Sequence, residues 1–547
     1  MNKECEINPT YANHAAGLIE TSPKYIRVIN RYAPYLKEIL IKTWINTHYA
    51  KMMIFSGRMI VPLPLILIGI VLVLLILFLR RNYGTLENCG FPVIPPTFCF
   101  GSGPFMMHKH NLAGLDQKRF EKYGKVWGAY VLSNPTVYIA DPEMIKQIFI
   151  KDFDHFLGHG FRMPQKYRSL STTTGEEWTQ LRKGLTPVFT SGKIKGMMQH
   201  VDGVVENMIN YLHKKIETDP VVDMRPVFKY YTMDVISKCA FGVDLNCFED
   251  PNNPMLVNSV EAFFDYQARD TKSSLLRNFA MLLDGIDRLV DLPMPATVEN
   301  LWNITKKIQT NRSAEKTNHE NFIDRLAELK KQLVKPGSSV TEDQLTAQGI
   351  VFFTAGFDTS ANSLGVLSYY LVNNPEVYGQ LMQEVNERLE DYDGKVGYEM
   401  VAEMPYLEAC VKEALRMSAP VARGARACNK DWEYKGIKIK KGTKIGIPFQ
   451  VVHKNPEYWP EPELFRPERF LKENANNIVP CSFLPFGEGP RACIGERFAI
   501  VEIKVAMARL LQEFTLAKCE KTKLKLEPGD LFMNDYKEMH IQISPRN

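Results

Sequence analysis

Apolar residues recur at helical spacing over most of the chain beyond residue 200. Residues three and four apart share one helix face, so apolar runs at these intervals predict amphipathic helices. Clusters of Gly or Pro separate the runs and predict where each helix ends. The helices predicted in this way are Val201–Lys215, Met224–Phe241, Asn321–Leu333, Thr341–Val372, Pro375–Leu389 and Tyr406–Met417.

Strand patterns are fewer and shorter than the helical ones. Two apolar runs, Tyr123–Leu132 and Pro135–Ala140, flank a Ser-Asn-Pro turn and predict a hairpin. Short strands are also predicted at Tyr434–Ile439 and Lys444–Pro448. Because no Pro/Ser-rich linker interrupts residues 120–547, the pattern predicts one large, mainly α-helical domain with a small β-sheet.

One apolar run near the N-terminus differs from all the others. Met59–Leu79 contains no charged or strongly polar side chain, and as a helix it would reach about 31 Å, enough to cross a bilayer. A buried core helix or a signal peptide is the alternative, but no small-residue cleavage site precedes Arg80 and Arg81. We therefore expect a single transmembrane anchor.

The anchor sets the predicted domain organisation. Residues 1–58 form an extension of unknown role or reflect a misassigned start codon, residues 59–79 form the anchor, residues 80–96 form a basic and Pro-rich hinge, and residues 97–547 form the main domain. Arg80 and Arg81 favour a cytosolic main domain, although basic residues upstream weaken this signal. A start at Met52, Met53 or Met59 would remove most of that upstream charge.

Composition excludes several classes of protein. Of the 547 residues, 45% are hydrophobic and 24% charged, which is typical of a folded globular protein. The net charge of +5 is too dilute for a dedicated nucleic-acid binder. Ten cysteines without a Cys-x-x-Cys pair indicate reduced thiols facing the cytosol rather than a disulfide scaffold.

The segment richest in candidate chemistry is Pro485–Gly495, which leads into an apolar helical pattern. It places Cys493 close to a helix start, where free N–H groups favour the thiolate. The alternatives are an ordinary buried cysteine or a dinucleotide fingerprint. The fingerprint is disfavoured because Pro490 interrupts the turn and no clear strand precedes it.

This segment resembles the haem-binding loop of the cytochrome P450 family, Phe-x-x-Gly-x-Arg-x-Cys-x-Gly. The five fixed places of that pattern are filled by Phe486, Gly489, Arg491, Cys493 and Gly495. Four further family motifs occur in the family order within the resemblance, which spans Phe91 to Ile543. They are Trp178-x-x-x-Arg182, Ala355-Gly356-Phe357-Asp358-Thr359-Ser360, Glu413-x-x-Arg416 and Pro467-Glu468-Arg469-Phe470.

The resemblance implies the cytochrome P450 fold, mainly α with a small β-sheet portion, behind one N-terminal transmembrane helix. It also implies haem b as cofactor, with the Cys493 thiolate as axial iron ligand. A further basic contact is expected from the loop between His155 and Thr174, where Arg162 and Arg168 both remain candidates. The other residues implied to bind the cofactor are Trp178, Arg182, Arg426, Arg491, Phe486 and Ala355.

The resemblance assigns catalysis to Thr359 and Asp358, an acid–alcohol pair suited to delivering protons to dioxygen. A glycine inside a helix costs about 1 kcal/mol relative to alanine, so Gly356 predicts close approach of a ligand to the backbone. Glu413, Arg416 and the Arg469 loop are expected to form a structural network behind the haem.

The implied function is hydroxylation of a lipophilic xenobiotic, steroid or fatty acid with O2. Electrons would come from NADPH through a membrane-bound cytochrome reductase docking on a basic face, with cytochrome b5 as a second possible donor. The phrases at Gly175–Trp178 and Phe189–Lys193 resemble the animal microsomal clan, which implies a single-pass protein of the endoplasmic reticulum membrane. The rival interpretations are rearrangement of a peroxide without reductase and a non-catalytic haem or ligand binder.

Aromatic and apolar residues are expected to line the substrate pocket, although each is equally compatible with plain core. They are Phe156–Met163, Phe263-Phe264, Phe352-Phe353, Val421-Ala422 and Leu531-Phe532-Met533. His155 and His159 have the spacing of a zinc protease, but Phe156 stands where such a site requires Glu. We therefore exclude zinc hydrolysis.

Overall fold

The computed structural model describes residues 63–98, 100–102, 112–160, 163–259, 296–314, 321–524 and 538–546, together with Met294, Asn534 and Tyr536. The chain divides into two compact units, Met1–Phe78 and Leu79–Asn547. The expectations for residues 1–62, Arg162, Phe263-Phe264 and residues 531–533 lie outside the described residues.

Helices dominate the described part of the chain. They are α3 (Leu63–Arg80), α4 (Leu112–Tyr123), α5 (Pro142–Lys146), α6 (Gly175–Leu185), α7 (Ser191–Ile216), α8 (Met224–Ile236), α11 (Ala296–Ala314), α12 (Phe322–Leu333), α13 (Glu342–Asn373), α14 (Pro375–Asp391), α15 (Tyr398–Ala402), α16 (Pro405–Met417), α17 (Phe449–His453) and α18 (Glu496–Glu513). Short 3-10 or π turns that border the site are η2 (Gln147–Lys151), η3 (Phe153–His155), η4 (Gln165–Tyr167), η7 (Pro467–Phe470) and η9 (Gly489–Arg491). All six helices predicted from periodicity are confirmed.

The strands form three small sheets among the described residues. The strands are β1 (Val126–Val131), β2 (Asn134–Ile139), β3 (Val221–Asp223), β4 (Arg423–Ala427), β5 (Trp432–Tyr434), β6 (Ile437–Ile439), β7 (Lys444–Pro448), β8 (Phe514–Ala517) and β9 (His540–Pro545). The sheet orders are β1-β2-β7-β4, β3-β9-β8 and β5-β6. The predicted hairpin is confirmed as β1 and β2, with Trp127 opposite Tyr138.

The prediction of one strand over Tyr434–Ile439 is wrong, because the chain turns there. Lys435 and Gly436 both adopt positive φ, 49° and 79°, and β5 and β6 pair antiparallel around them. Two successive residues with positive φ are the hallmark of the tight turns that close hairpins. Strand β4, which carries Arg426 opposite Ile445 of β7, was not predicted.

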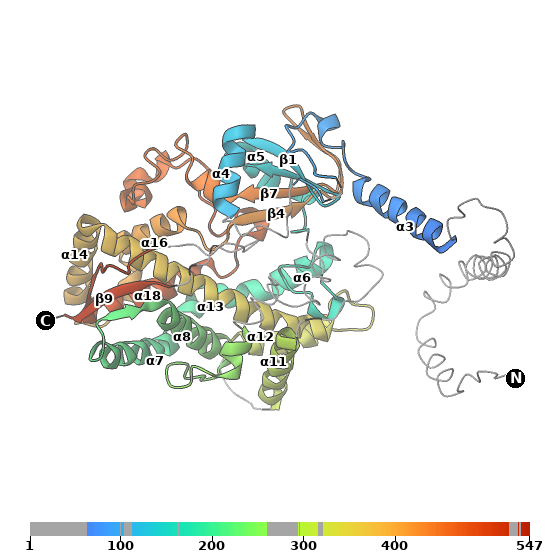
Figure 1. Ribbon diagram of the computed structural model, residues 1–547. Coiled ribbons are helices and arrows are strands. Elements are labelled where there is room, and N and C mark those ends of the chain that lie inside the picture. The colour runs from blue at the N-terminus through green and yellow to red at the C-terminus, as the bar shows by residue number, and fades with distance from the viewer. Residues whose placement is uncertain are drawn as a thin grey trace, which may run out of the picture. The chain divides into compact units, whose positions relative to one another are not determined.

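Helix α13 is the central element of the Leu79–Asn547 unit. Thr341 caps its start by accepting from Gln344 N, while the Gln344 side chain accepts from Thr341 N. In Figure 1 α13 runs through the middle of this unit, with α7, α8 and α12 on one side and the sheet of β1, β7 and β4 on the other. It is long and apolar enough to cross a membrane, but 61% of its most apolar window is buried, as in a core helix.

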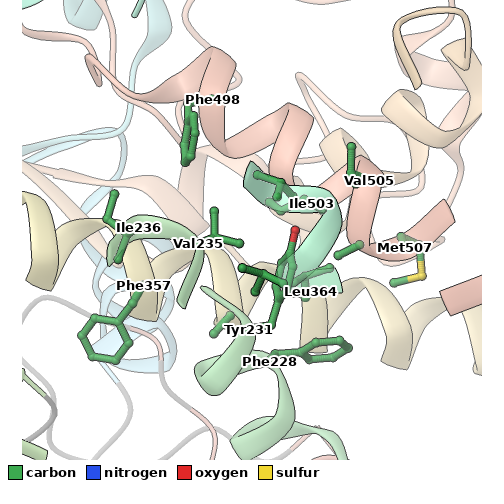
Figure 2. Packing of buried hydrophobic residues seen from close by; sticks show 14 of the residues in the cluster. Phe228, Tyr231, Val235, Ile236, Phe357, Leu364, Phe498, Ile503, Val505 and Met507 are labelled. Atoms are coloured by element: carbon green, nitrogen blue, oxygen red, sulfur yellow. The ribbon is translucent and has the colours of Figure 1, made fainter. Parts of the chain in front are cut away.

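The main hydrophobic core lies where α8, α13 and α18 meet. Figure 2 shows Tyr231 and Ile236 of α8 among side chains of α13 and α18, including Phe357 and Leu364 of α13. The Tyr231 hydroxyl points toward α18 and donates to the Glu502 carbonyl at 3.1 Å. This core fixes the distance between the central helix and the helix that follows the cysteine loop.

Helix α3 is apolar and, unlike α13, exposes its side chains. Val71, Leu74 and Leu77 are 63%, 59% and 61% exposed. The helix contains no acidic residue and one basic residue, Arg80, in its last turn. A long apolar helix with exposed side chains requires an apolar environment to cover it.

Candidate active site

The cysteine loop is built around two glycines with positive φ. Gly487 and Gly489 adopt φ values of 70° and 74°. A Cβ at Gly489 would lie 2.1 Å from the Phe149 carbonyl oxygen, so only glycine lets the loop reach the η2 segment. The Cys493 N–H donates to the Phe486 carbonyl at 2.8 Å, which closes the loop just before α18 begins.

Cys493 is an exposed residue, although protein atoms crowd around it so closely that burial raises the pKa of the thiol. The N–H groups of Gly495 and Glu496 at the start of α18 act in the opposite direction, as the sequence predicted, and so does the nearby Arg182. An exposed cysteine that is closely surrounded by protein atoms fits the binding of a cofactor through its sulfur.

Two nearly buried arginines belong to the same region as Cys493. Arg491 is 8% exposed, donates to Thr173 O at 2.6 Å and places its Cζ 4.5 Å from the centre of the Trp178 ring. Arg426 is 2% exposed and places its Cζ 4.0 Å from the Phe149 ring. The Nε atoms of both arginines lack a hydrogen-bond partner among the described residues.

Electrostatics show that these cations lie close together. Burial and the charge of Arg491 lower the pKa of Arg426 to about 9, and burial and the charge of Arg182 lower the pKa of Arg491 to about 10. Within the described ranges, no carboxylate forms an ion pair with Arg182, Arg426 or Arg491. Guanidinium groups buried without a counter-ion require an anionic partner, and the paired carboxylates of a haem fit that requirement.

His159 joins this cluster, and sequence reasoning missed it. Ala427 N donates to Gly158 O at 2.7 Å, which fixes the loop against β4 and brings His159 Nδ1 within 3.1 Å of Arg426 Nη1. Burial and the charges of Arg426 and Arg491 lower the pKa of His159 to about 3, so the ring is neutral. The one spacing in which this histidine stands, four residues after His155, points to a different kind of site and not to this cluster.

Of the two arginines considered for the same loop, only Arg168 is described. Arg168 is 45% exposed in its side chain and lies 3.9 Å from Glu177, so it belongs to the surface. Arg162 lies outside the described residues. His155 contacts Asp154, away from His159, and the described residues hold no cluster of three metal-ligating side chains.

On α13 the predicted catalytic pair does not share one face. Ala355 is exposed, and the Thr359 hydroxyl donates to its carbonyl at 2.7 Å. Asp358 is only 2% exposed and turns toward α8. A Cβ at Gly356 would lie 2.8 Å from Ile236 Cδ1 of α8. This glycine therefore permits close helix packing, a reason that the sequence did not predict.

Comparison with known proteins agrees with this geometry. The Cytochrome P450 family profile matches residues 92–542. Cytochrome P450 3A29 of Sus scrofa is 34% identical over 497 residues, which cover 88% of this chain and 96% of the relative. Cytochrome P450 3A16 of Mus musculus is 33% identical over 492 residues, covering 88% and 97%.

The chain belongs to the cytochrome P450 family. It is therefore a cytochrome P450 monooxygenase, and the family implies a haem-thiolate centre. The microsomal members also imply a reductase as electron donor.

The structural network expected of a cytochrome P450 is confirmed. Arg416 forms two parallel hydrogen bonds to Glu413, from Nε at 2.7 Å and Nη2 at 2.8 Å, and both side chains are fully buried. Arg469 Nε lies 3.4 Å from Glu413 Oε1, and Arg466 N donates to the same oxygen at 2.9 Å. The network locks α16 to η7.

The three described aromatic residues expected in the substrate pocket of this cytochrome P450, Phe156, Phe352 and Phe353, are buried. Phe353 stacks on Phe241 and Phe352 stacks on Phe322, with ring centres 3.6 Å and 3.7 Å apart. Phe156 is fully buried. Phe352 and Phe353 thus pack against other aromatic rings of the core. Helical periodicity shows which faces are buried, but it does not show which buried faces border a cavity.

Proposed function

We propose that this cytochrome P450 is a membrane-anchored microsomal monooxygenase that hydroxylates a lipophilic small molecule, a xenobiotic, a steroid or a fatty acid. The observation that carries the proposal is an exposed Cys493, closely surrounded by protein atoms, near buried guanidinium groups that form no ion pair within the described residues. A thiolate ligand and cationic partners for two carboxylates are what haem requires from a protein.

Each residue around the thiol has a specific part in holding haem b. Cys493 would hold the haem through its sulfur, and Arg182, Arg426 and Arg491 would bind its carboxylates through charge-assisted hydrogen bonds. Trp178 orients Arg491 by ring contact, Phe486 shapes the cysteine loop, and Ala355 would leave room for the group. Haem, when bound, supplies the activation of dioxygen with two electrons.

Proton supply falls to Thr359 and Asp358. The Thr359 hydroxyl donates to Ala355 O, which leaves its oxygen free to accept a hydrogen bond from a water or a substrate group on the exposed side of α13. Asp358 is the nearest acid along the helix and serves as the proton source. Its intact presence disfavours the rival in which a peroxide rearranges without reductase.

The setting of the enzyme follows from its family and from α3. We propose an endoplasmic reticulum membrane location with the Leu79–Asn547 unit in the cytosol, and α3 within the bilayer. Electrons come from an NADPH-dependent cytochrome reductase, with cytochrome b5 as a second donor. The lipophilic substrate then reaches the enzyme from the same membrane.

The axial ligand is tested by the carbon monoxide difference spectrum of the reduced, purified protein, measured beside Cys493→Ser. We expect the strongly red-shifted Soret band of a thiolate-ligated haem in the wild type and its loss in the variant. Cys410→Ser is the matched control, because Cys410 is fully buried on α16. A wild-type spectrum typical of histidine ligation would refute the assignment.

Turnover separates the enzyme from its rivals. Protein reconstituted with reductase and NADPH is assayed with testosterone, lauric acid and 7-ethoxycoumarin, which represent the three substrate classes. Thr359→Ala should lower product formed per NADPH, whereas Thr354→Ala should not, because Thr354 makes the same kind of bond to Ile350 O outside the motif. Haem binding without turnover of any probe would favour the binder, and turnover with peroxide alone would favour the reductase-independent rival.

A further inference from the structure

One face of helix α8 makes three successive contacts with the catalytic segment of α13. Lys229, Thr232 and Ile236 follow one another at helical spacing and therefore share this face. Ile236 packs into the space left by Gly356, and Figure 2 shows its side chain near Phe357. One turn earlier, the Thr232 hydroxyl donates to the Phe357 carbonyl at 2.8 Å.

The third contact on this face is an ion pair. Lys229 Nζ lies 2.7 Å from Asp358 Oδ1, and the two side chains are 13% and 3% exposed. Neither carboxylate oxygen of Asp358 has a hydrogen bond of regular geometry among the described residues, so the ammonium is its charge partner there. A buried carboxylate is stable as an anion only beside such a partner.

The Lys229–Asp358 ion pair depends on the close packing of α8 against α13. Because Gly356 lacks a side chain, α8 approaches α13 closely enough for Thr232 to reach a backbone carbonyl and for Lys229 to reach Asp358. The same contact turns Asp358 toward α8, whereas Ala355 on another face of α13 stays exposed. Asp358 is thus held toward Lys229, and the Lys229 side chain is the more exposed of the two.

We infer that Lys229 is a positioning residue for Asp358. It keeps the carboxylate turned toward α8 as the anion of their 2.7 Å ion pair, and, as the more exposed of the two side chains, it links this buried acid to solvent. The inference rests on the proposed role of Asp358 in proton supply. It adds a residue on α8, outside every motif of the sequence, to the machinery of the reaction.

The first test measures the charge of Asp358 directly and requires no substrate. Infrared spectra of the full-length haem-loaded protein are recorded for Lys229→Met, Lys229→Arg and the unchanged protein, each against its Asp358→Asn counterpart. We expect ionised carboxylate bands for the unchanged protein and Lys229→Arg, and a protonated carboxylic acid band for Lys229→Met. An ionised Asp358 in Lys229→Met would overturn the inference.

The second test measures the consequence for catalysis, with the probe substrate that is turned over in the reconstituted assay. Lys229→Met should lower kcat about tenfold with an unchanged KM, and Lys229→Arg should restore most of it. Thr232→Val is the matched control, because it removes a neutral contact of the same helix pair and keeps the ion pair. An unchanged kcat in Lys229→Met beside a loss in Asp358→Asn would overturn the positioning role.

The two tests distinguish failure of the inference from failure of the proposed function. If Asp358→Asn leaves kcat unchanged, the proton route through Asp358 is wrong, and the infrared comparison still decides whether Lys229 governs the carboxylate. If Lys229→Met loses haem, its reduced carbon monoxide spectrum reveals this, and Lys229→Gln replaces it in both measurements.

Discussion

The residues around Cys493 show that the site is arranged for an anion. Arg426 and Arg491 are nearly buried. Burial and the neighbouring cations lower their pKa values only to about 9 and about 10, so both side chains stay positively charged at neutral pH. Burying like charges together is unfavourable unless a counter-ion completes the group. Under the proposed function, the two carboxylates of the cofactor would be that counter-ion and would stabilise the fold on binding.

Removing one of these cations should weaken retention of haem. Arg426→Gln loses a charge-assisted hydrogen bond to a propionate, so we expect haem to transfer to apomyoglobin about tenfold faster. Arg168→Gln on the exposed side of the neighbouring loop is the control and should transfer haem at the unchanged rate. Equal rates for both variants would show that Arg426 does not bind the cofactor.

Glu502 predicts a pH dependence of stability. Burial raises the pKa of this fully enclosed carboxyl from 4.5 to about 8, partly offset by a hydrogen bond from Ser360. The folded protein holds this proton up to about pH 8, whereas the unfolded chain releases it near 4.5. The stability that Glu502 contributes is thus complete below about pH 4.5 and is lost as the pH rises toward 8.

Glu502→Gln removes this dependence and should raise the thermal midpoint increasingly from pH 5.5 to pH 7.5. Each pH unit contributes up to about 1.4 kcal/mol over this range. Glu376→Gln, at an exposed position of α14, should shift the midpoint equally at both pH values. A pH-independent difference for Glu502→Gln would mean that the carboxyl does not retain its proton.

At the scale of elements, the α8–α13 contact depends on one missing side chain. Gly356→Ala would place a Cβ 2.8 Å from Ile236 Cδ1 and 2.9 Å from its Cγ1, and the branched side chain has little freedom to move away. We expect a loss of about 1–3 kcal/mol in the free energy of unfolding, seen as a lower thermal midpoint.

The matched control for this change is Gly379→Ala on α14, where a Cβ meets nothing within 4 Å. That variant should gain about 1 kcal/mol from helix propensity. Ile236→Val in the Gly356→Ala background should recover part of the loss by removing the nearest atom. If Gly356→Ala and Gly379→Ala are equally stable, the close approach of α8 is not required.

Elements with local signals could be predicted from the sequence, and elements that depend on distant partners could not. Helix α13 has a capping residue and a long apolar period, and the β1–β2 hairpin has its turn between the strands. Strand β4 exists because β7 pairs with it, and nothing local distinguishes the two. Likewise, Cys493 follows from its loop motif, whereas His159 and Lys229 acquire their roles only from the direction of side chains in three dimensions.

At the scale of the whole molecule, the two units differ in how their apolar side chains are covered. The Leu79–Asn547 unit buries its apolar side chains in cores of its own. Helix α3 has exposed apolar side chains along its length instead. It spans about 27 Å, close to the hydrocarbon thickness of about 30 Å that a transmembrane helix must cover. This length is what the proposed membrane anchor requires.

This difference predicts separable roles for the units. The full-length protein expressed in microsomes should resist extraction by alkaline carbonate, whereas a variant that begins at Arg80 should be extracted. The carbon monoxide spectrum of that variant should remain unchanged, because all residues assigned to the haem lie beyond α3.

Replacing Leu72, Val73 and Leu74 with Lys in the full-length protein should release it in the same way, since each central charge costs about 3 kcal/mol to insert. Extraction of the unchanged protein by carbonate would contradict the anchor.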